Sequence, residues 1–373
     1  MLSSIAARLA TLALLIVIPE PARPRANPED TLEQVATLRA ARAAHTATTL
    51  RSGKVLIAGG MAGGGSLDAV ELFDPARNTL EPLGSLSDGR AGHTATLVPD
   101  GRVVIAGGYD GQYLRTVEIF DPSTNRFQSA GALREERSEH TATLLADGRI
   151  LIAGGVGRGW TFLRSAELYD PVTGRSTSVQ PMSVPREGHT ATLLSDGRVL
   201  VIGGHTNRRP NVVLHATAEI FDPRTGRWEA AGSMGKPRHK HDAIRLTDGR
   251  VLIIGGADVT DRVHFETTEI YAPGTGTFTA GPSMRHRRYK IARTSILLPN
   301  GSVLVTSGAR WAGLFDVGAM RFREVPGSMP DGYRFAAAAL LPDGDVIISG
   351  GYSDGNATTN GVWRFRQGPP AVR

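Results

Sequence analysis

The chain has 373 residues, of which 40% are apolar, and a formal net charge of +6. It contains no cysteine, which excludes disulfides, thiol nucleophiles, lipid-modified cysteines and zinc–thiolate sites. A chain of this length buries a large core, and related repeats fill nearly all of it, so we expect one domain at residues 27–373.

The first 26 residues have the pattern of a secretory signal peptide. Arg8 precedes an apolar run from Leu9 to Ile18, and the segment PEPARPRA follows. The run is shorter than the about 20 residues that a membrane span needs. We therefore predict a signal peptide at residues 1–26, a secreted or periplasmic location, and no membrane contact beyond this segment. An uncleaved anchor is the alternative.

Seven related units follow, at a spacing of roughly 43–52 residues, which is typical of a solenoid, a propeller or an array. Five units begin with close variants of HTATLLADGRILIAGG, and looser versions begin at Arg293 and Ala336. Within a unit, Asp-Gly between two apolar segments predicts a two-residue type I′ hairpin turn. The continuous apolar run that follows predicts a strand buried on both faces, ending at a glycine pair.

The second half of each unit predicts two more strands. A variable loop leads to a third strand with an aromatic residue, and a second aromatic lies seven positions later on a fourth strand, as in Phe120 and Phe127. Four antiparallel strands repeated radially predict an all-β, seven-bladed propeller. The last unit lacks its fourth strand, and residues 31–45 align with residues 126–140. We therefore expect the N-terminal strand to complete the last blade and close the ring.

The glycine pair and the two aromatics resemble the Kelch repeat, over about residues 31–366. Seven such blades also resemble the propeller domain of galactose oxidase-type proteins, whose copper site includes a cysteine cross-linked to a tyrosine. Because this chain has no cysteine, the resemblance implies the fold without that copper site. Some Kelch-like propellers are similar to sugar-processing proteins, including sialic acid mutarotases, whose sites are built from channel-facing polar residues.

Histidine and arginine recur at equivalent positions of five units. The repeated histidines are His45, His93, His140, His189 and His241, and the repeated arginines are Arg42, Arg90, Arg137, Arg186 and Arg238. Histidines spread around a ring are too far apart to share one metal ion. We predict hydrogen bonds between blades for them, and glutamates on the third strands as partners of the arginines. The motifs predict no catalytic residue, no cofactor and no metal site.

Recognition is expected where the repeat is broken, in loops on one face of the propeller. Ten residues form the predicted ligand-binding site. The aromatics among them are Tyr113, Trp160 and Trp311, and the bases are Arg208, Arg209, Lys236, Lys240, Arg285, Arg287 and Arg288. Exposed aromatics beside arginines suit stacking on sugar rings or peptide side chains. The alternatives are ordinary loop packing for the aromatics and a solvated edge without a ligand for the bases.

These residues predict a monomeric binding module for an anionic polysaccharide or an acidic protein or peptide. Nucleic acid is not expected, because no nucleic-acid motif accompanies the bases. The alternatives are a sugar-processing enzyme, mutarotase-, epimerase- or oxidase-like, with a composite site at the channel mouth, and a pure scaffold. On the binding hypothesis, changing Arg287 and Arg288 together to Glu is expected to abolish binding while changing stability little.

Overall fold

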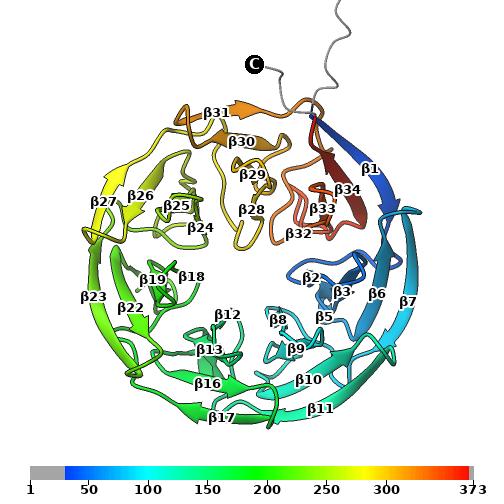
Figure 1. The fold of residues 1–373 in the computed structure, drawn as a ribbon, viewed down its shortest axis with the longest axis horizontal. Coiled ribbons are helices and arrows are strands. Elements are labelled where there is room, and N and C mark those ends of the chain that lie inside the picture. Colours follow the sequence, from blue (N-terminus) through cyan, green and yellow to red (C-terminus); the bar gives the residue numbers. More distant parts are fainter. Residues whose placement is uncertain (1–29, 369–373) are drawn as a thin grey trace, which may run out of the picture.

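The computed structural model describes residues 30–368, which form a seven-bladed β-propeller around a central channel (Figure 1). Each blade is a four-stranded antiparallel sheet. The predicted signal peptide at residues 1–26 lies outside the described residues. Within residues 30–368 the structure contains no helix that is long and apolar enough to cross a membrane.

The blades follow one another in chain order. Blade 1 is β2 (Thr46–Thr49), β3 (Val55–Ala58), β6 (Ala69–Asp74) and β7 (Thr79–Ser85). Blade 2 is β8 (Thr94–Leu97), β9 (Val103–Ala106), β10 (Thr116–Asp121) and β11 (Arg126–Ala132). Blade 3 is β12 (Thr141–Leu144), β13 (Ile150–Ala153), β16 (Ala166–Asp170) and β17 (Arg175–Ser178). Blades 4 and 5 are β18 (Thr190–Leu193), β19 (Val199–Ile202), β22 (Thr217–Asp222) and β23 (Arg227–Ser233); and β24 (Asp242–Arg245), β25 (Val251–Ile254), β26 (Thr268–Ala272) and β27 (Thr277–Ala280). Blade 6 is β28 (Ser295–Leu297), β29 (Val303–Val305), β30 (Gly313–Asp316) and β31 (Arg321–Glu324).

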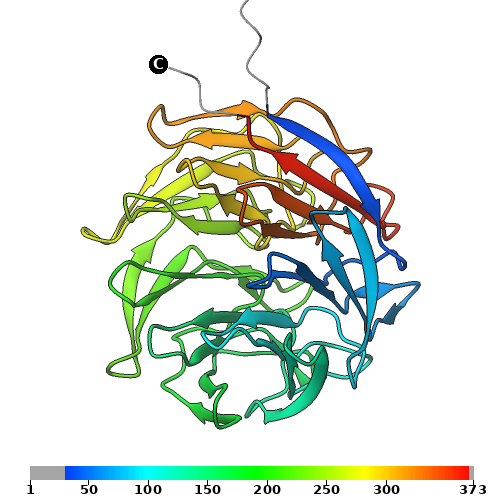
Figure 2. The same cartoon turned by 45° about the vertical axis from the view of Figure 1, so that its right-hand side comes forward.

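The N-terminal strand closes the ring, as predicted. Blade 7 consists of β32 (Ala337–Leu340), β33 (Val346–Ser349), β34 (Gly361–Arg366) and β1 (Thr31–Thr37), and β1 is its outermost strand. Leu32 pairs with Phe365, so the two ends of the chain share one sheet. Figure 2 shows β1 lying along β34. Closure removes the exposed sheet edges that an open ring would leave.

The core lies between the blades. Each of seven buried apolar clusters combines side chains of two neighbouring blades, and the cluster between blades 1 and 2, for example, joins Leu56 and Leu72 to Ile105 and Phe120. Continuous apolar runs form the second strands because both faces of these strands are covered by neighbouring sheets. The blades therefore stabilise one another, and the loops at the ends of the sheets are free to carry recognition.

The predicted type I′ turn is wrong. In blade 3, the N–H of Gly148 donates to the carbonyl of Leu145 and the N–H of Leu145 donates to that of Arg149, which makes a longer loop. Gly148 has a φ of +85°, but Asp147 does not have the positive φ that a type I′ turn requires. Its carboxylate instead accepts the N–H of Arg149 at 3.0 Å. Asp-Gly here is a side-chain-capped turn that ends in one left-handed glycine.

Short elements build the loops between second and third strands. They are β4 (Met61–Ala62), β5 (Gly65–Ser66), β14 (Val156–Gly157), the 3-10 turn η1 (Arg158–Trp160), β15 (Thr161–Phe162), β20 (His205–Thr206) and β21 (Val213–Leu214). Three two-stranded ribbons result, from blades 1, 3 and 4. They lie at one mouth of the channel and supply part of the site described next.

Candidate functional site

One residue from each connection between blades lines the mouth of the channel in the left-handed backbone region. We call these residues the mouth ring: Ala44, Gly92, Glu139, Gly188, Lys240, Lys290 and Phe335, with φ between +52° and +64°. In six of them the backbone N–H donates to the carbonyl of the preceding ring residue, at 2.7 to 3.0 Å. Backbone hydrogen bonds thus join all neighbouring members of the mouth ring except Glu139 and Gly188, and the side chains are what differs between blades.

A cavity of about 820 Å³, which we call the basin, lies over the mouth ring. Its walls are loops of blades 1 to 5 and 7, and ring residues Ala44, Gly92, Glu139, Lys240 and Phe335 belong to its lining. A volume of this size is typical of small-molecule sites. The basin combines an aromatic wall with a charged floor, and each has its own structural basis.

The aromatic wall consists of Tyr109, Tyr113 and Trp160. The Tyr113 ring packs edge-on against both neighbours, with ring centroids 5.1 Å from Tyr109 and 6.0 Å from Trp160. The guanidinium of Arg208 lies 3.7 Å from the centroid of the Trp160 ring. Trp160 nevertheless stays 50% exposed, which is unusual for a large apolar side chain. An open indole face held by neighbours is a preformed stacking surface.

The floor contains a chain of four groups: Glu187, His205, His239 and Asp261. The Nε2 of His205 lies 2.8 Å from Glu187 Oε2, the Nε2 of His239 lies 2.8 Å from Asp261 Oδ1, and the two Nδ1 atoms are 3.0 Å apart. The Nδ1 of His205 also lies 3.1 Å from the backbone carbonyl of Glu187. Burial lowers the pKa of His239, while the side chain of Asp261 opposes this effect. The two imidazoles thus link the two carboxylates across the floor.

Asp261 gathers further bases. The Nζ of Lys240 and the Nη2 of Arg209 each lie 3.3 Å from its Oδ2. Although burial opposes ionisation, His239 and Lys240 hold the pKa of Asp261 well below its usual range. Burial likewise opposes ionisation of Glu187, but His205 lowers its pKa. Both floor carboxylates are thus anionic, and they neutralise much of the basic charge around them.

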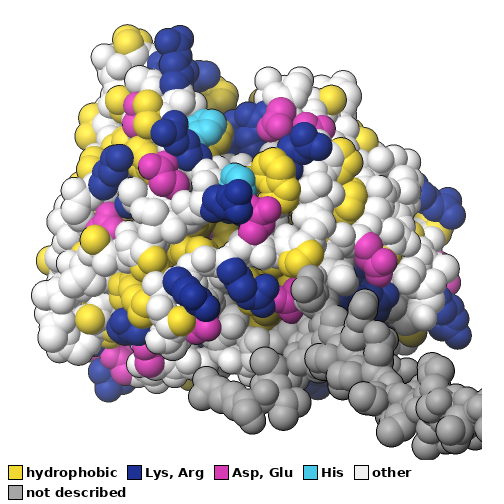
Figure 3. Space-filling view, turned by 90° about the horizontal axis from the view of Figure 1, so that it is seen from above, with side chains coloured by type: hydrophobic (Ala, Val, Ile, Leu, Met, Phe, Trp, Pro, Cys, Tyr) yellow, Lys and Arg dark blue, Asp and Glu magenta, His cyan; other side chains and the backbone are white. Residues whose placement is uncertain are grey.

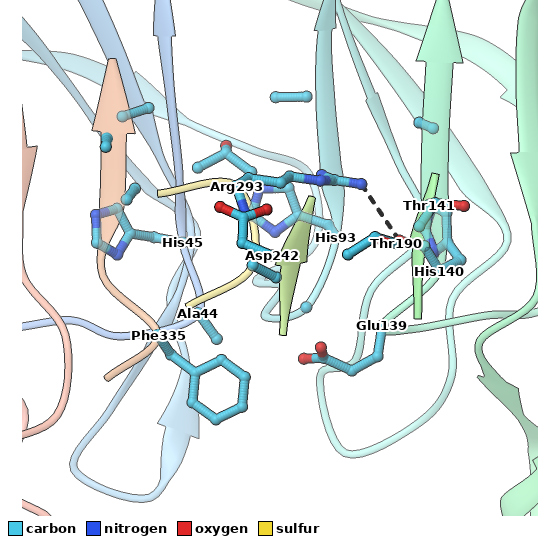
Figure 4. A pocket seen from close by; sticks show the side chains of 18 of the residues that line it. Ala44, His45, His93, Glu139, His140, Thr141, Thr190, Asp242, Arg293 and Phe335 are labelled. Atoms are coloured by element: carbon cyan, nitrogen blue, oxygen red, sulfur yellow. Dashed lines mark hydrogen bonds between the residues drawn. The ribbon is translucent and has the colours of Figure 1, made fainter. Parts of the chain in front are cut away.

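A chamber of about 250 Å³ lies in the channel next to the mouth ring (Figure 4). Four of the five repeated histidines line it, all but His241. The Nε2 atoms of the repeated histidines bond across to the preceding blade, as in Thr94 with His140 at 3.1 Å. Burial lowers the pKa of His93 and of His189 to about 3. The predicted blade-to-blade role is confirmed, and these imidazoles are neutral wall groups.

Glu139 stands where the basin meets the chamber. Burial, and secondarily the charge of Glu187, raise its pKa to about 7, against the opposing effect of Lys240, Arg293 and Lys290. A carboxyl group that titrates near neutral pH in a cleft suits proton transfer. Lys290 of the mouth ring also titrates near neutral pH, because burial and the charge of Lys240 lower its pKa to about 8.

The predicted partners of the repeated arginines are confirmed. Each guanidinium lies 2.6 to 3.0 Å from a glutamate of the third strand; the pairs are Arg42–Glu71, Arg90–Glu118, Arg137–Glu167, Arg186–Glu219 and Arg238–Glu269. Each arginine also donates to the carbonyl of the first glycine of the glycine pair, as Arg90 does to Gly107 at 2.9 Å. The arginines hold the loop connections onto the blades, so they are structural.

Arg288 is the sixth arginine of this series, and its assignment to the ligand site is wrong. It is 2% exposed, and its guanidinium donates to the carbonyls of Ser307, at 2.6 Å, and Trp311, at 2.5 Å. Gly313 stands where the other blades carry the partner glutamate, so no carboxylate meets the guanidinium at that position. A change of Arg288 to Glu would bury an unpaired carboxylate, so the expected small effect on stability is also wrong.

Five of the ten predicted residues come together in the basin: Tyr113, Trp160, Arg208, Arg209 and Lys240. The remaining four candidates, Lys236, Arg285, Arg287 and Trp311, are not part of its lining. Arg285 lies 3.4 Å from Glu324 and Arg287 lies 3.1 Å from Glu266. A carboxylate therefore neutralises the charge of each of these arginines. Trp311 stacks on His286 at 4.7 Å. Figure 3 shows acidic and basic side chains intermingled on the edge that faces the viewer.

The predicted ligand-binding site does not include Glu139, His205, His239 or Arg293. Glu139 precedes a repeated histidine at a position where three other units have alanine or glycine, and this departure is a usable signal. His205 follows a glycine pair and His239 follows a repeated arginine, but nothing in the sequence shows that they meet. The repeat aligns Arg293 with the repeated histidines, whereas the structure places Ile291 in that position, against Gly255.

Comparisons with known proteins agree with the fold. A family model described as Kelch motif matches residues 90–133, 139–183 and 188–235. A fungal alcohol oxidase of the AA5 family, solved in complex with copper, superposes with a TM-score of 0.68 and 15% identity, over 92% of this chain and 76% of that chain. At this identity the likeness concerns the fold alone. No curated protein matches the sequence.

The copper of that oxidase does not fit the residues found here. The chain has no cysteine, and residues 30–368 contain no group of three or more histidine, aspartate or glutamate side chains placed to hold a metal ion. The repeated histidines direct Nε2 into bonds between blades, as His189 does to Thr141 at 3.1 Å. The basin must therefore be understood through its aromatic and charged groups.

Proposed function

Because this chain is a Kelch-repeat β-propeller with a preformed basin over its channel, we propose that it binds a saccharide with an acidic group in that basin. The observation that carries the proposal is that the half-exposed Trp160 ring and a floor of charged groups line one cavity. Sugar rings present an apolar face of C–H groups and an edge of hydroxyls. An aromatic wall and a polar floor match these two sides.

The wall is already organised for stacking. Tyr113 and Arg208 both contact the indole of Trp160, so little side-chain freedom remains to be lost when a ligand arrives. The floor offers directional partners, since the carboxylates of Glu187 and Asp261 accept hydrogen bonds and Lys240 donates them. Both features support a small saccharide over an extended polyanion on the outer surface.

A binding assay with matched tryptophan variants tests this proposal. Purified protein is measured by calorimetry against uronic acids and short acidic oligosaccharides, and Trp160→Ala is compared with Trp311→Ala, which removes an aromatic outside the basin. We expect Trp160→Ala to weaken binding by at least about tenfold and Trp311→Ala to leave it unchanged. Equal effects of both variants, or loss only with Trp311→Ala, would show that the ligand lies elsewhere.

A sugar-processing enzyme is the second candidate, and Glu139 favours it. Its carboxyl, with a pKa near 7, can both give and take a proton at the place where the basin narrows into the channel. If the protein is such an enzyme, it accelerates the interconversion of anomers of a bound sugar, or the uptake of deuterium from solvent into that sugar. NMR follows either process. Glu139→Gln should abolish turnover while keeping affinity. If the wild-type protein binds the sugar without accelerating either reaction, the enzyme candidate fails and the binding function remains.

The location and partners of the protein follow as part of the same proposal. The signal-like pattern of residues 1–26 supports a secreted or periplasmic protein, where acidic polysaccharides and their fragments occur. An acidic peptide could use the same bases, and a peptide panel in the calorimetric assay separates the two. Size-exclusion chromatography with light scattering tests the expected monomer.

A further inference from the structure

The basic residues that line the basin do not show which group pairs with the acidic group of the ligand. Arg209 and Lys240 are both engaged by Asp261, and Arg208 lies against Trp160. Each therefore has a partner in the protein already. A cation without such a partner is found deeper, in the chamber below the mouth ring.

Arg293 reaches this chamber because blade 6 begins differently from the other blades. Four positions separate Arg238 from the first residue of β24, whereas seven separate Arg288 from the first residue of β28. Of the three added residues, 292–294, Ala292 and Arg293 line the chamber, whereas Thr294 is buried. The carboxylate of Asp242 holds them by accepting the N–H groups of Arg293, Thr294 and Ser295 at 2.8 to 3.1 Å.

The guanidinium of Arg293 crosses the channel toward blade 3. Among the described residues its side chain makes one hydrogen bond, a long one of 3.4 Å from Nη2 to the carbonyl of His140 (Figure 4). No acidic oxygen of residues 30–368 lies within 4.0 Å of it as an ion-pair partner. Asp242 already accepts a fourth N–H, from Ala243, so its oxygens are committed to the backbone. Most of the five guanidinium donors are unused.

Burial lowers the pKa of Arg293 and the charges of Glu139 and Asp242 raise it, but neither carboxylate forms an ion pair with it. The imidazoles around it stay neutral, because burial lowers the pKa of His93 and His189 to about 3. The chamber adjoins the basin, since Ala44, Gly92, Glu139 and Phe335 line both. A volume of about 250 Å³ leaves room for a carboxylate and several water molecules.

We propose that the chamber binds a carboxylate at Arg293, and that this carboxylate is the acidic group of the saccharide held in the basin. The second part rests on the proposed function, whereas the first does not. A planar carboxylate pairs with the guanidinium through two parallel hydrogen bonds, which a halide cannot form. The ligand then lies with its ring against Trp160 and its acid directed down the channel.

Two probes separate the parts of this proposal. D-Glucuronate and its neutral amide D-glucuronamide differ only in the acid, and we expect the wild-type protein to prefer glucuronate by at least about tenfold in calorimetry. Arg293→Gln should remove the preference, Arg293→Lys should keep part of it, and Arg227→Gln, on the outer strand β23, should leave it intact. Equal binding of both sugars by the wild type, or a preference kept by Arg293→Gln, overturns the placement of the acid while the basin remains a saccharide site.

Formate tests the chamber without a sugar. Thermal unfolding is compared in sodium formate and sodium chloride at equal ionic strength. Formate should raise the melting temperature of the wild type and of Arg227→Gln in a saturable way, and should have no such effect on Arg293→Gln. If neither sugar binds the wild type, the proposed function fails, and the formate result still decides the chamber. The same formate effect in Arg293→Gln, or none in the wild type, overturns the carboxylate site.

Discussion

Replacing Leu32 by Ala tests whether β1 is a structural strand of blade 7. Leu32 is 7% exposed, pairs with Phe365, and packs in the cluster that joins blade 7 to Val325 of blade 6. Truncating a buried leucine to alanine costs about 2–5 kcal/mol. Because β1 is an outer strand, where neighbours can relax partly into the gap, we expect a loss of about 3 kcal/mol in the free energy of unfolding.

Urea denaturation of the purified variant measures this loss. Leu80→Ala is the control, since Leu80 pairs with Phe73 at the same place in blade 1, on a strand that is continuous with its blade. Leu80 is less buried than Leu32, so its variant should lose less. A chain that begins at residue 39 lacks β1 and Leu38, which is 1% exposed, and we expect it to aggregate. A loss below about 0.5 kcal/mol for Leu32→Ala, or a shortened chain that melts at the wild-type temperature, would refute closure by β1.

Three further predictions concern the channel and its connections. The fold keeps the repeated histidines neutral, so below their usual pKa of 6.5 the unfolded chain takes up protons that the folded chain cannot. At pH 5 each such histidine lowers the free energy of unfolding by about 2 kcal/mol. Fluorescence should therefore show unfolding near that pH. A fold that persists to about pH 3.5 would contradict this. Arg288→Gln should cost about 2–4 kcal/mol, because two buried carbonyls lose their donor, whereas the neighbouring Arg287→Gln should change stability by less than about 0.5 kcal/mol in the same urea assay. Glu139 has a pKa of about 7 in the folded chain and of 4.5 when unfolded, so the fold loses stability as the pH rises from about 4.5 to about 7. Glu139→Gln removes this loss, so it should raise stability by at most about 3 kcal/mol at pH 8 and not at pH 4. Equal effects at both pH values would contradict the raised pKa.

The architecture was predictable because the same packing problem is solved seven times. A second strand such as β13 must be apolar on both faces wherever it stands between two sheets, and its glycine pair must recur because a side chain there would meet the next blade. A Cβ on Gly154, for instance, would lie 2.6 Å from His189. Because the units repeat, each such requirement appears as a pattern in the sequence. The same comparison of units shows that the last one lacks its fourth strand, which β1 supplies.

Blade 6 departs from the sequence prediction for a physical reason. The repeated arginine is recognisable by its neighbours, a histidine three residues later and a glutamate on the third strand. In blade 6 these are Ile291 and Gly313, so Arg288 resembles an addition to the unit. The arginine can still be buried because backbone carbonyls alone satisfy it. Its burial cannot be inferred from a motif whose partners have been replaced.

The site itself arises from the closing of the ring, which no single unit records. Glu139 and Arg293 are 154 positions apart, yet both reach the chamber, because every blade presents its mouth-ring connection to the same axis. Reading one unit along the chain finds what all blades share. Comparing one equivalent position across all units shows which side chains meet at the axis. At the mouth ring this position is alanine or glycine in some units and Glu139, Lys240, Lys290 or Phe335 in the others. In a ring of near-identical blades, side chains that differ at an axial position have no packing requirement in common, so their chemistry is available to a ligand on the axis.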